Sequence, residues 1–318
     1  MSTTLKRPEM GTERARTGIT GFIRRHPVAT FYALAFAISW GAILLILGPD
    51  GLFSTGETMP LAGGAALLAG PSISGVLLTV LVDGRLGLRR LVSRLRRWRV
   101  GARWYAVALL TGPLVMVAAV FVLSLASPEF RPDLLTADNK LSIVVTGIVV
   151  GLMVGFFEEL GWTGFALPRL RQLYGVVTTG LVMGLLWSAW HLPMFAGTTD
   201  PTGTLPGALV VAVLLFAWLP PYRVLMVWVY DRTESLLIAM LMHVPISVTT
   251  FTLASEATSS TALVVPVLIW GAAFWVIVAI VAWANGWHLA RRQDAAAQEG
   301  VALERGSGDR QGTATACR

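Results

Sequence analysis

Long apolar segments, separated by short polar ones, run along most of the chain. A helix of roughly 20 apolar residues crosses the hydrocarbon core of a bilayer, and each segment is about that long. Helices are the predicted elements, because backbone polar groups in lipid must be satisfied within the segment and the alternation typical of a membrane barrel is absent. We therefore predict an all-α, polytopic membrane protein with about eight transmembrane helices, at residues 28–47, 61–82, 104–126, 141–165, 175–195, 206–229, 236–254 and 262–286.

Polar stretches flank this membrane region on both sides. We expect a basic cytoplasmic tail over residues 1–27, a transmembrane domain over 28–286 and a disordered cytoplasmic tail over 287–318. The first apolar segment exceeds the roughly 7–15-residue core of a signal peptide, and no small-residue cleavage site follows it. It is therefore predicted to be a retained span.

The composition agrees with a membrane protein. Of 318 residues, 55% are hydrophobic and 14% are charged, whereas soluble domains carry about 25% charged residues. The mean hydropathy is +0.67. These values exclude a soluble enzyme and a nucleic-acid-binding module. The single cysteine, Cys317, leaves no partner for an internal disulfide and excludes a disulfide scaffold.

The net charge of +7 is concentrated at predicted loops and tails on one side of the membrane. Six Lys/Arg lie in residues 1–27, eight Arg lie between Arg85 and Arg103, and five follow Trp287. Basic residues beside apolar spans mark cytoplasmic segments. We therefore expect a multi-pass protein of the cell membrane with both termini in the cytoplasm, in contact with lipid and not with nucleic acid.

The loop over residues 83–103 interleaves arginines with apolar residues. This pattern is typical of an amphipathic helix lying at the membrane interface. A solvated loop that only sets the topology would have the same composition, and the sequence leaves both interpretations open.

Five ionisable residues lie inside predicted spans: Glu158 and Glu159 in the fourth, Arg223 in the sixth, and His191 and His243 in the fifth and seventh. Each costs a few kcal/mol in lipid unless it is paired or hydrated. Adjacent helical residues point about 100° apart, so one glutamate can face a cavity while the other binds a cation. Taken singly, the glutamates could extend to the interface and each histidine could make an interhelical hydrogen bond. Together they could converge on one water molecule.

Counting along the spans places Glu158 toward the cytoplasmic side and His191 toward the outer side. Convergence of the two then requires a bent or displaced helix. Gly155, Gly161 and Gly164 could allow a bend in the fourth span. Trp187 and Trp190 flank His191, with Trp187 on the same helical face. Single aromatic residues in such positions are usually interface anchors.

Three motifs resemble those of the CAAX protease and bacteriocin-processing family, which includes CAAX prenyl endopeptidase and its bacterial Abi relatives. The similarity covers about residues 140–250. The motifs are Glu158-Glu159-Leu-Gly-Trp-Thr-Gly-Phe, Trp187-Ser-Ala-Trp-His191-Leu-Pro, and Tyr230-Asp231-Arg232-Thr233 leading to His243.

The resemblance implies an intramembrane glutamate-dependent endopeptidase of all-α fold. By this resemblance, Glu158 and His191 activate the attacking water. His243, helped by Ser247 four residues later, stabilises the oxyanion. Glu159 has a structural or electrostatic role. General bases and oxyanion donors in a water-poor site are strong catalytic contributions.

Two positions depart from the family pattern. Thr163 stands where the first motif normally has an arginine, and Ser247 stands where the third normally has an asparagine. Serine can still donate one hydrogen bond. Threonine cannot neutralise Glu159, so either Arg223 or Arg169 replaces the missing cation or the Glu159 carboxyl is held protonated.

Three alternatives remain at this stage. Carboxylate and imidazole groups also suit a zinc-dependent membrane protease, although HExxH is absent. The two departures are consistent with a pseudoprotease that acts as a membrane scaffold or immunity factor. Buried Glu and His also suit a proton-coupled transporter, although no internal repeat is evident. On the leading interpretation the partner is a peptide or membrane-protein substrate, prenylated or not, and no cofactor is expected.

Overall fold

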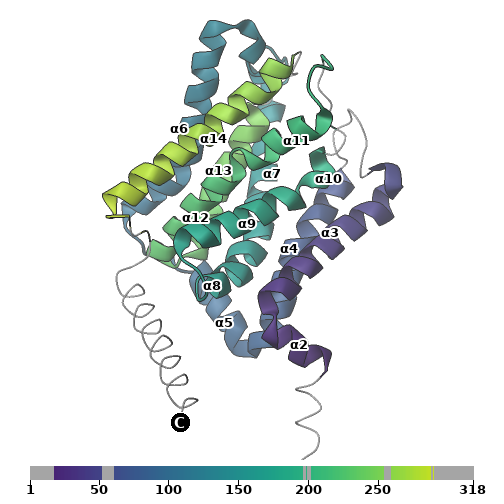
Figure 1. The fold of residues 1–318 in the computed structure, drawn as a ribbon, viewed down its shortest axis with the longest axis vertical. Coiled ribbons are helices and arrows are strands. Elements are labelled where there is room, and N and C mark those ends of the chain that lie inside the picture. Colours follow the sequence, from purple (N-terminus) through teal and green to yellow (C-terminus); the bar gives the residue numbers. More distant parts are fainter. Residues whose placement is uncertain are drawn as a thin grey trace, which may run out of the picture.

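A computed structural model describes residues 18–51, 61–195, 198, 202–253, 259–287 and 289. Within these ranges all regular elements are helical (Figure 1). Nearly all of the predicted disordered tail, and most of the basic tail, lie outside the described residues. The α-helices are α2 (Ile19–Arg25), α3 (Pro27–Gly51), α4 (Leu61–Leu78), α5 (Gly84–Leu95), α6 (Ala102–Ala126), α7 (Lys140–Gly161), α8 (Leu167–Leu170), α9 (Val176–Trp190), α10 (Leu192–Phe195), α11 (Gly207–Phe216), α12 (Leu219–Thr233), α13 (Leu236–Thr252) and α14 (Ser260–Ala284).

The predicted all-α membrane fold is confirmed. Among the described residues, six helical segments are long and apolar enough to cross a membrane, at Pro27–Pro49, Ala62–Leu95, Ala102–Ala126, Lys140–Leu170, Gly207–Thr233 and Ser260–Ala284. Two shorter apolar helices, α9 and α13, correspond to the fifth and seventh predicted segments. With 15 and 17 residues they fall short of a full crossing.

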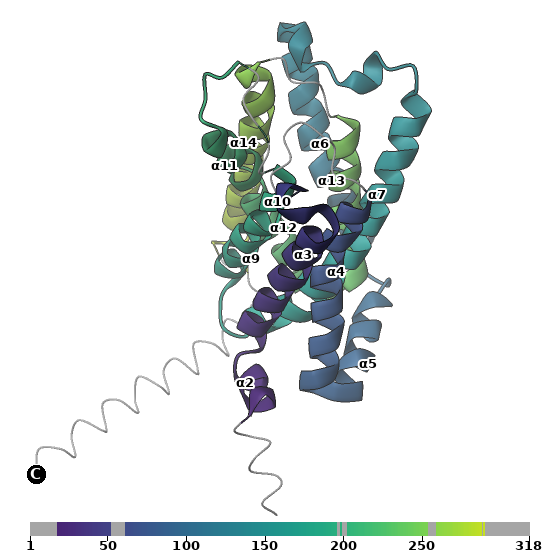
Figure 2. The ribbon, with the colours of Figure 1, turned by 90° about the vertical axis from the view of Figure 1, so that its right-hand side faces the viewer.

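The arginine-rich segment after α4 forms a helix that packs on the protein. A π-helical turn, Thr79–Asp83, leads into α5, whose Leu91 is buried against Leu236 and Met240 of α13. From the end of α5, Arg94 donates hydrogen bonds to the Gly164 carbonyl at 2.8 Å and to a tyrosine hydroxyl. The amphipathic helix therefore forms, and α5 lies with α2 at the lower end of the molecule (Figures 1 and 2).

A stripe of glycines on α7 allows α13 to pack unusually close to it. Gly147, Gly151 and Gly155 are four residues apart and therefore lie on one helical face. A methyl group on Gly155 would lie 3.1 Å from the Val244 nitrogen, and one on Gly151 would lie 3.0 Å from the Val244 carbonyl oxygen. Small residues at such crossings let membrane helices approach through their backbones. The next position on the same face is Glu159, so this packing brings that carboxylate to α13.

A second close crossing joins α9 to α12. A methyl group on Gly180 would lie 2.5 Å from the Val224 Cα, and one on Gly184 would lie 2.6 Å from the Pro220 Cα. Helix α12 is buried along most of its length, including the Arg223 side chain at 0% exposure. Helices α7, α9, α12 and α13 therefore meet around the polar residues that the sequence places in the membrane.

We expect the double substitution Gly151→Ala, Gly155→Ala to lower the thermal unfolding midpoint of the detergent-purified protein by several degrees. The added methyl groups overpack the α7–α13 crossing, and overpacking costs about 1–3 kcal/mol. Tryptophan fluorescence during heating measures the change. The matched control is Leu152→Ala, Met153→Ala on the same helix, whose side chains are 48% and 46% exposed. A glycine variant at least as stable as the control would contradict the proposed role of the stripe.

Candidate active site

Glu158 lies near the C-terminal end of α7 with its side chain buried. Its Oε2 atom accepts two indole hydrogen bonds, from Trp162 Nε1 at 3.2 Å and from Trp187 Nε1 at 2.7 Å. Trp162 follows one turn later on the same helical path, and Trp187 comes from α9. Both donors are neutral, so the carboxylate is oriented without being neutralised.

Glu159 is held by three groups from three different helical segments. Arg223 Nη1 of α12 lies 3.0 Å from Oε1 and 3.1 Å from Oε2. His243 Nδ1 of α13 lies 2.9 Å from Oε1, and the Thr163 hydroxyl donates to Oε2. The Glu159 and Arg223 side chains are 0% exposed. Such a pair requires extra hydrogen bonds to offset its desolvation, and Thr163 and His243 provide them.

His191 is the C-cap residue of α9 and is partly buried. Its Nδ1 atom lies 2.8 Å from the carbonyl oxygen of Trp187. Because a carbonyl only accepts hydrogen bonds, Nδ1 must carry the proton. In the neutral ring the Nε2 atom then has a free lone pair, as a general base requires.

His243 and Ser247 lie one turn apart on α13. His243 is buried and directs Nδ1 to Glu159, which leaves Nε2 on the opposite side of the ring. The Ser247 hydroxyl is partly buried and donates to the His243 carbonyl oxygen at 3.1 Å. Ser247 is therefore near the cluster but is hydrogen-bonded within its own helix.

The Trp187 ring lies at the centre of these groups. Its centroid is 5.6 Å from the ring of His191 and 5.0 Å from the ring of His243, both edge to face. The Arg223 guanidinium carbon lies 4.7 Å from the same centroid. With the indole hydrogen bond to Glu158, this one side chain touches both histidines, one glutamate and the arginine. The structure thus brings Glu158, His191 and His243 to one place.

The irregular segment of the fourth span lies at Gly164, one of the three glycines predicted to allow a bend. Helix α7 runs without interruption through both glutamates to Gly161, and Gly155 packs against α13. A π-helical segment, Trp162–Ala166, begins only after them and contains Gly164. Helix α9 ends at Trp190, so His191 lies directly after its last residue, beside Trp187. Of the three glycines, Gly155 packs against α13 and Gly164 lies in the π-helical segment.

Arg223, and not Arg169, is the cation that contacts Glu159. Arg169 instead pairs with Asp83, with Nη2 and Oδ2 2.6 Å apart. The buried Arg223 Nε and Nη2 atoms have no hydrogen-bond partner among the described residues. Buried donors of this kind usually meet an acceptor, in protein or in ordered water. Arg223 therefore has donor capacity left beside the cluster.

The hydrogen bonds from Trp162 and Trp187 to Glu158 differ from the role predicted from the sequence, in which the tryptophans beside His191 are interface anchors. The available signal was spacing, since Trp162 lies four residues after Glu158 and Trp187 lies four residues before His191. Residues four apart share a helix face, and an indole there can donate to a buried acceptor.

The arrangement of the candidate site also bears on metal binding. Across the part of the chain that the structure describes, no group of three or more His, Cys, Asp or Glu side chains could hold a metal ion. Glu159, the carboxylate nearest to His243, already binds Arg223, His243 and Thr163.

The region that holds this site is similar to known proteins. Residues 140–249 match the family model described as type II CAAX prenyl endopeptidase Rce1-like. CAAX prenyl protease 2 of Methanococcus maripaludis is 26% identical over 94 residues, which are 29% of this chain and 35% of that protein. The chain therefore aligns with about a third of this curated relative. All five predicted site residues fall within 140–249, the region in which this chain is similar to the CAAX prenyl endopeptidases.

Proposed function

We propose that this protein is an intramembrane endopeptidase that hydrolyses a peptide bond with a water molecule activated by Glu158 and His191. The observation that carries the proposal is the arrangement of Glu158, His191 and His243 around Trp187, inside a membrane helix bundle. Such a site offers a base and a hydrogen-bond donor to a reacting carbonyl where bulk water is scarce.

The proposed reaction begins at Glu158. Both of its indole hydrogen bonds go to Oε2, so Oε1 is the oxygen that takes a proton from water. His191 Nε2 orients the same water molecule through its lone pair. The water oxygen bonds to the carbonyl carbon, and the carbonyl electron pair moves to oxygen. Glu158 then returns its proton to the leaving amine as the carbon–nitrogen bond breaks.

His243 is the proposed oxyanion donor. Its Nδ1 proton is held by Glu159, and a proton on Nε2 can then point toward the developing negative charge. The Glu159 carboxylate stabilises the imidazolium that this role requires, in the way a carboxylate orients a catalytic histidine elsewhere. Ser247 adds a second donor when its hydroxyl turns from the His243 carbonyl.

Glu159 is proposed to act by positioning. Its contacts with Arg223, Thr163 and His243 join α7 to α12 and α13. Arg223 supplies the charge that the arginine of the first family motif would supply at position 163. On this proposal, a threonine at position 163 in place of the family's arginine is compatible with activity.

The proposed substrate is a peptide or membrane protein. The relative from Methanococcus maripaludis is a CAAX prenyl protease by name, and the proposal for this chain includes substrates with and without a prenyl group. The arginine-rich segments support an orientation with both termini in the cytoplasm of a cell membrane.

We expect Glu158→Gln to lower peptide hydrolysis by at least about 100-fold while the protein stays folded. The amide oxygen can still accept the indole hydrogen bonds, but it cannot take a proton from water. Cleavage of a fluorogenic peptide library by detergent-purified protein in excess chelator measures the loss. The matched control is Glu234→Gln, a half-exposed glutamate paired with Arg97. Chelator-sensitive cleavage would instead support a metal-dependent protease, and cleavage by the variant at the wild-type rate would refute the role of Glu158.

We expect Arg223→Met to destabilise the protein far more than the double variant Glu159→Gln, Arg223→Met. Removing only the cation leaves a buried carboxylate, at a cost of about 3–5 kcal/mol, whereas the double variant removes both charges. Thermal unfolding of the wild type, both single variants and the double variant gives the coupling. Additive effects of the two substitutions would contradict the pairing.

We expect Ser247→Ala to lower the rate of cleavage below that of the wild type, and Ser247→Asn to cleave at the wild-type rate or faster. Alanine removes a donor, whereas the longer asparagine amide reaches beyond the helix backbone that the serine hydroxyl now contacts. The loss in kcat should be about tenfold or more if the donor serves the oxyanion. Thr250→Ala, three residues later on the same helix, is the control, since its hydroxyl also donates to the helix backbone. Equal rates for the proteins with serine, alanine and asparagine at position 247 would exclude a catalytic role for this position.

A further inference from the structure

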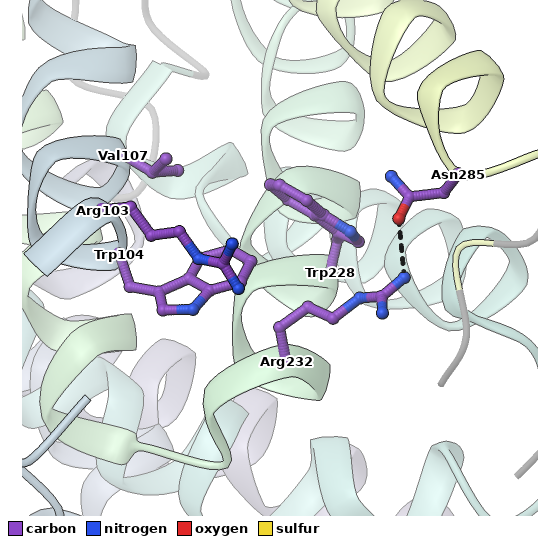
Figure 3. Close-up of a pocket in the computed structure, with 6 residues that line it drawn as sticks. All are labelled: Arg103, Trp104, Val107, Trp228, Arg232 and Asn285. Carbon is purple, nitrogen blue, oxygen red and sulfur yellow. Dashed lines mark hydrogen bonds between the residues drawn. The ribbon is translucent and has the colours of Figure 1, made fainter. Parts of the chain in front are cut away.

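A pocket lies away from the candidate active site, where three membrane helices come together near their ends. Its volume is about 220 Å³. It lies between the beginning of α6 and the ends of α12 and α14. Nine residues separate Arg232 in this pocket from Arg223 in the candidate site, about 14 Å along a helix axis. The lining residues are Arg103, Trp104, Val107, Trp228, Arg232 and Asn285 (Figure 3).

Two guanidinium groups extend into this pocket. The Arg103 guanidinium carbon lies 5.2 Å from the ring centroid of Trp104, and its side chain is exposed. Arg232 Nη2 donates to Asn285 Oδ1 at 2.9 Å and to the Leu289 carbonyl at 3.3 Å (Figure 3). These contacts orient the Arg232 guanidinium. The pocket is therefore lined by two guanidinium groups, one held by hydrogen bonds and one lying over a tryptophan ring.

A third hydrogen-bond donor lines this pocket, on Trp228. The Nε1 atom of Trp228 is buried, and it has no hydrogen-bond partner within the described residues. An indole N–H is a donor only, and burying it without a partner is unfavourable. The Trp228 ring packs edge to face on Trp104, with centroids 5.1 Å apart. The wall beside the donors is therefore apolar and aromatic.

Because the pocket lies at the ends of membrane helices, it is expected to face the lipid headgroups. Helix α6 begins at Ala102, seven residues after the end of α5, so the pocket opens on the side of the arginine-rich segment. Tryptophan and arginine are the side chains that favour the boundary between hydrocarbon and headgroups. Basic pockets between membrane helices on the cytoplasmic side suit anionic headgroups.

We propose that this pocket binds the phosphate of an anionic phospholipid. Arg103 and Arg232 would hold the phosphate oxygens, as guanidinium groups bind phosphate in a planar, charge-assisted geometry. Trp228 Nε1 would donate to the same group or to the glycerol ester. Trp104 and Val107 would contact the first carbons of the acyl chains. The site is independent of peptide hydrolysis.

Native mass spectrometry of the full chain, titrated in detergent with dioleoyl phosphatidylglycerol, tests this site through the dissociation constant of the first bound lipid. We expect binding to weaken about fivefold for each arginine lost in Arg103→Gln and Arg232→Gln. Trp228→Phe, which keeps the ring and removes the donor, should weaken it at least about threefold. The matched control is Arg89→Gln, Arg90→Gln on the exposed face of α5, with the same loss of charge.

The outcomes distinguish a specific lipid-binding site from nonspecific electrostatic attraction of anionic lipid. Selective weakening in the pocket variants, with unchanged melting temperatures, supports the proposal. Equal weakening in the α5 control overturns it, because binding then follows net charge alone. Inorganic phosphate is the second probe: if millimolar phosphate displaces the lipid completely in the wild type, the ligand is free phosphate and the lipid assignment is wrong. Should Arg232→Gln fail to fold, Arg103→Gln and Trp228→Phe decide the question.

Discussion

The buried Glu159 carboxylate is the constraint on which the rest of this bundle depends. A charge without water must be met by cations and donors at short range, and here they come from α12, α13 and the turn after α7. Close helix crossings at glycine positions make that arrangement possible, because each contact requires backbones to approach. Stability of the membrane core and geometry of the candidate site therefore have the same origin.

Trp187 is the second residue that organises the site, because it contacts most of the other polar side chains. An indole has one donor and a large apolar surface, so it can fix a carboxylate and pack against two imidazoles and a guanidinium at once. The acid–base groups are thereby held apart at defined angles without being neutralised by one another. Glu158 and Glu159, adjacent in sequence, have different environments: Glu158 accepts hydrogen bonds from neutral indole donors, whereas Glu159 pairs with the Arg223 cation.

Much of the fold could be predicted from hydrophobic length alone, and the positions of Glu158, His191 and His243 stood out because ionisable residues are rare in apolar spans. The partner of Glu159 could only be narrowed to Arg223 or Arg169, since the choice depends on how α12 packs against α7. The tryptophan hydrogen bonds to Glu158 were missed, because indole groups at helical spacing are equally suited to packing. The predicted fifth span runs to residue 195, whereas α9 ends at Trp190, three residues before Pro193.

The ion pair between Glu159 and Arg223 joins residues 64 positions apart. An arginine at position 163 would have lain one turn from the carboxylate, and α7 could then have entered the bilayer already neutralised. In this chain α7 is synthesised before α12, so during biosynthesis the carboxylate waits for its cation. Until the sixth predicted span is synthesised, the carboxyl group has to stay hydrated, be shielded or bind a proton, so burial of this charge depends on a helix that is made later.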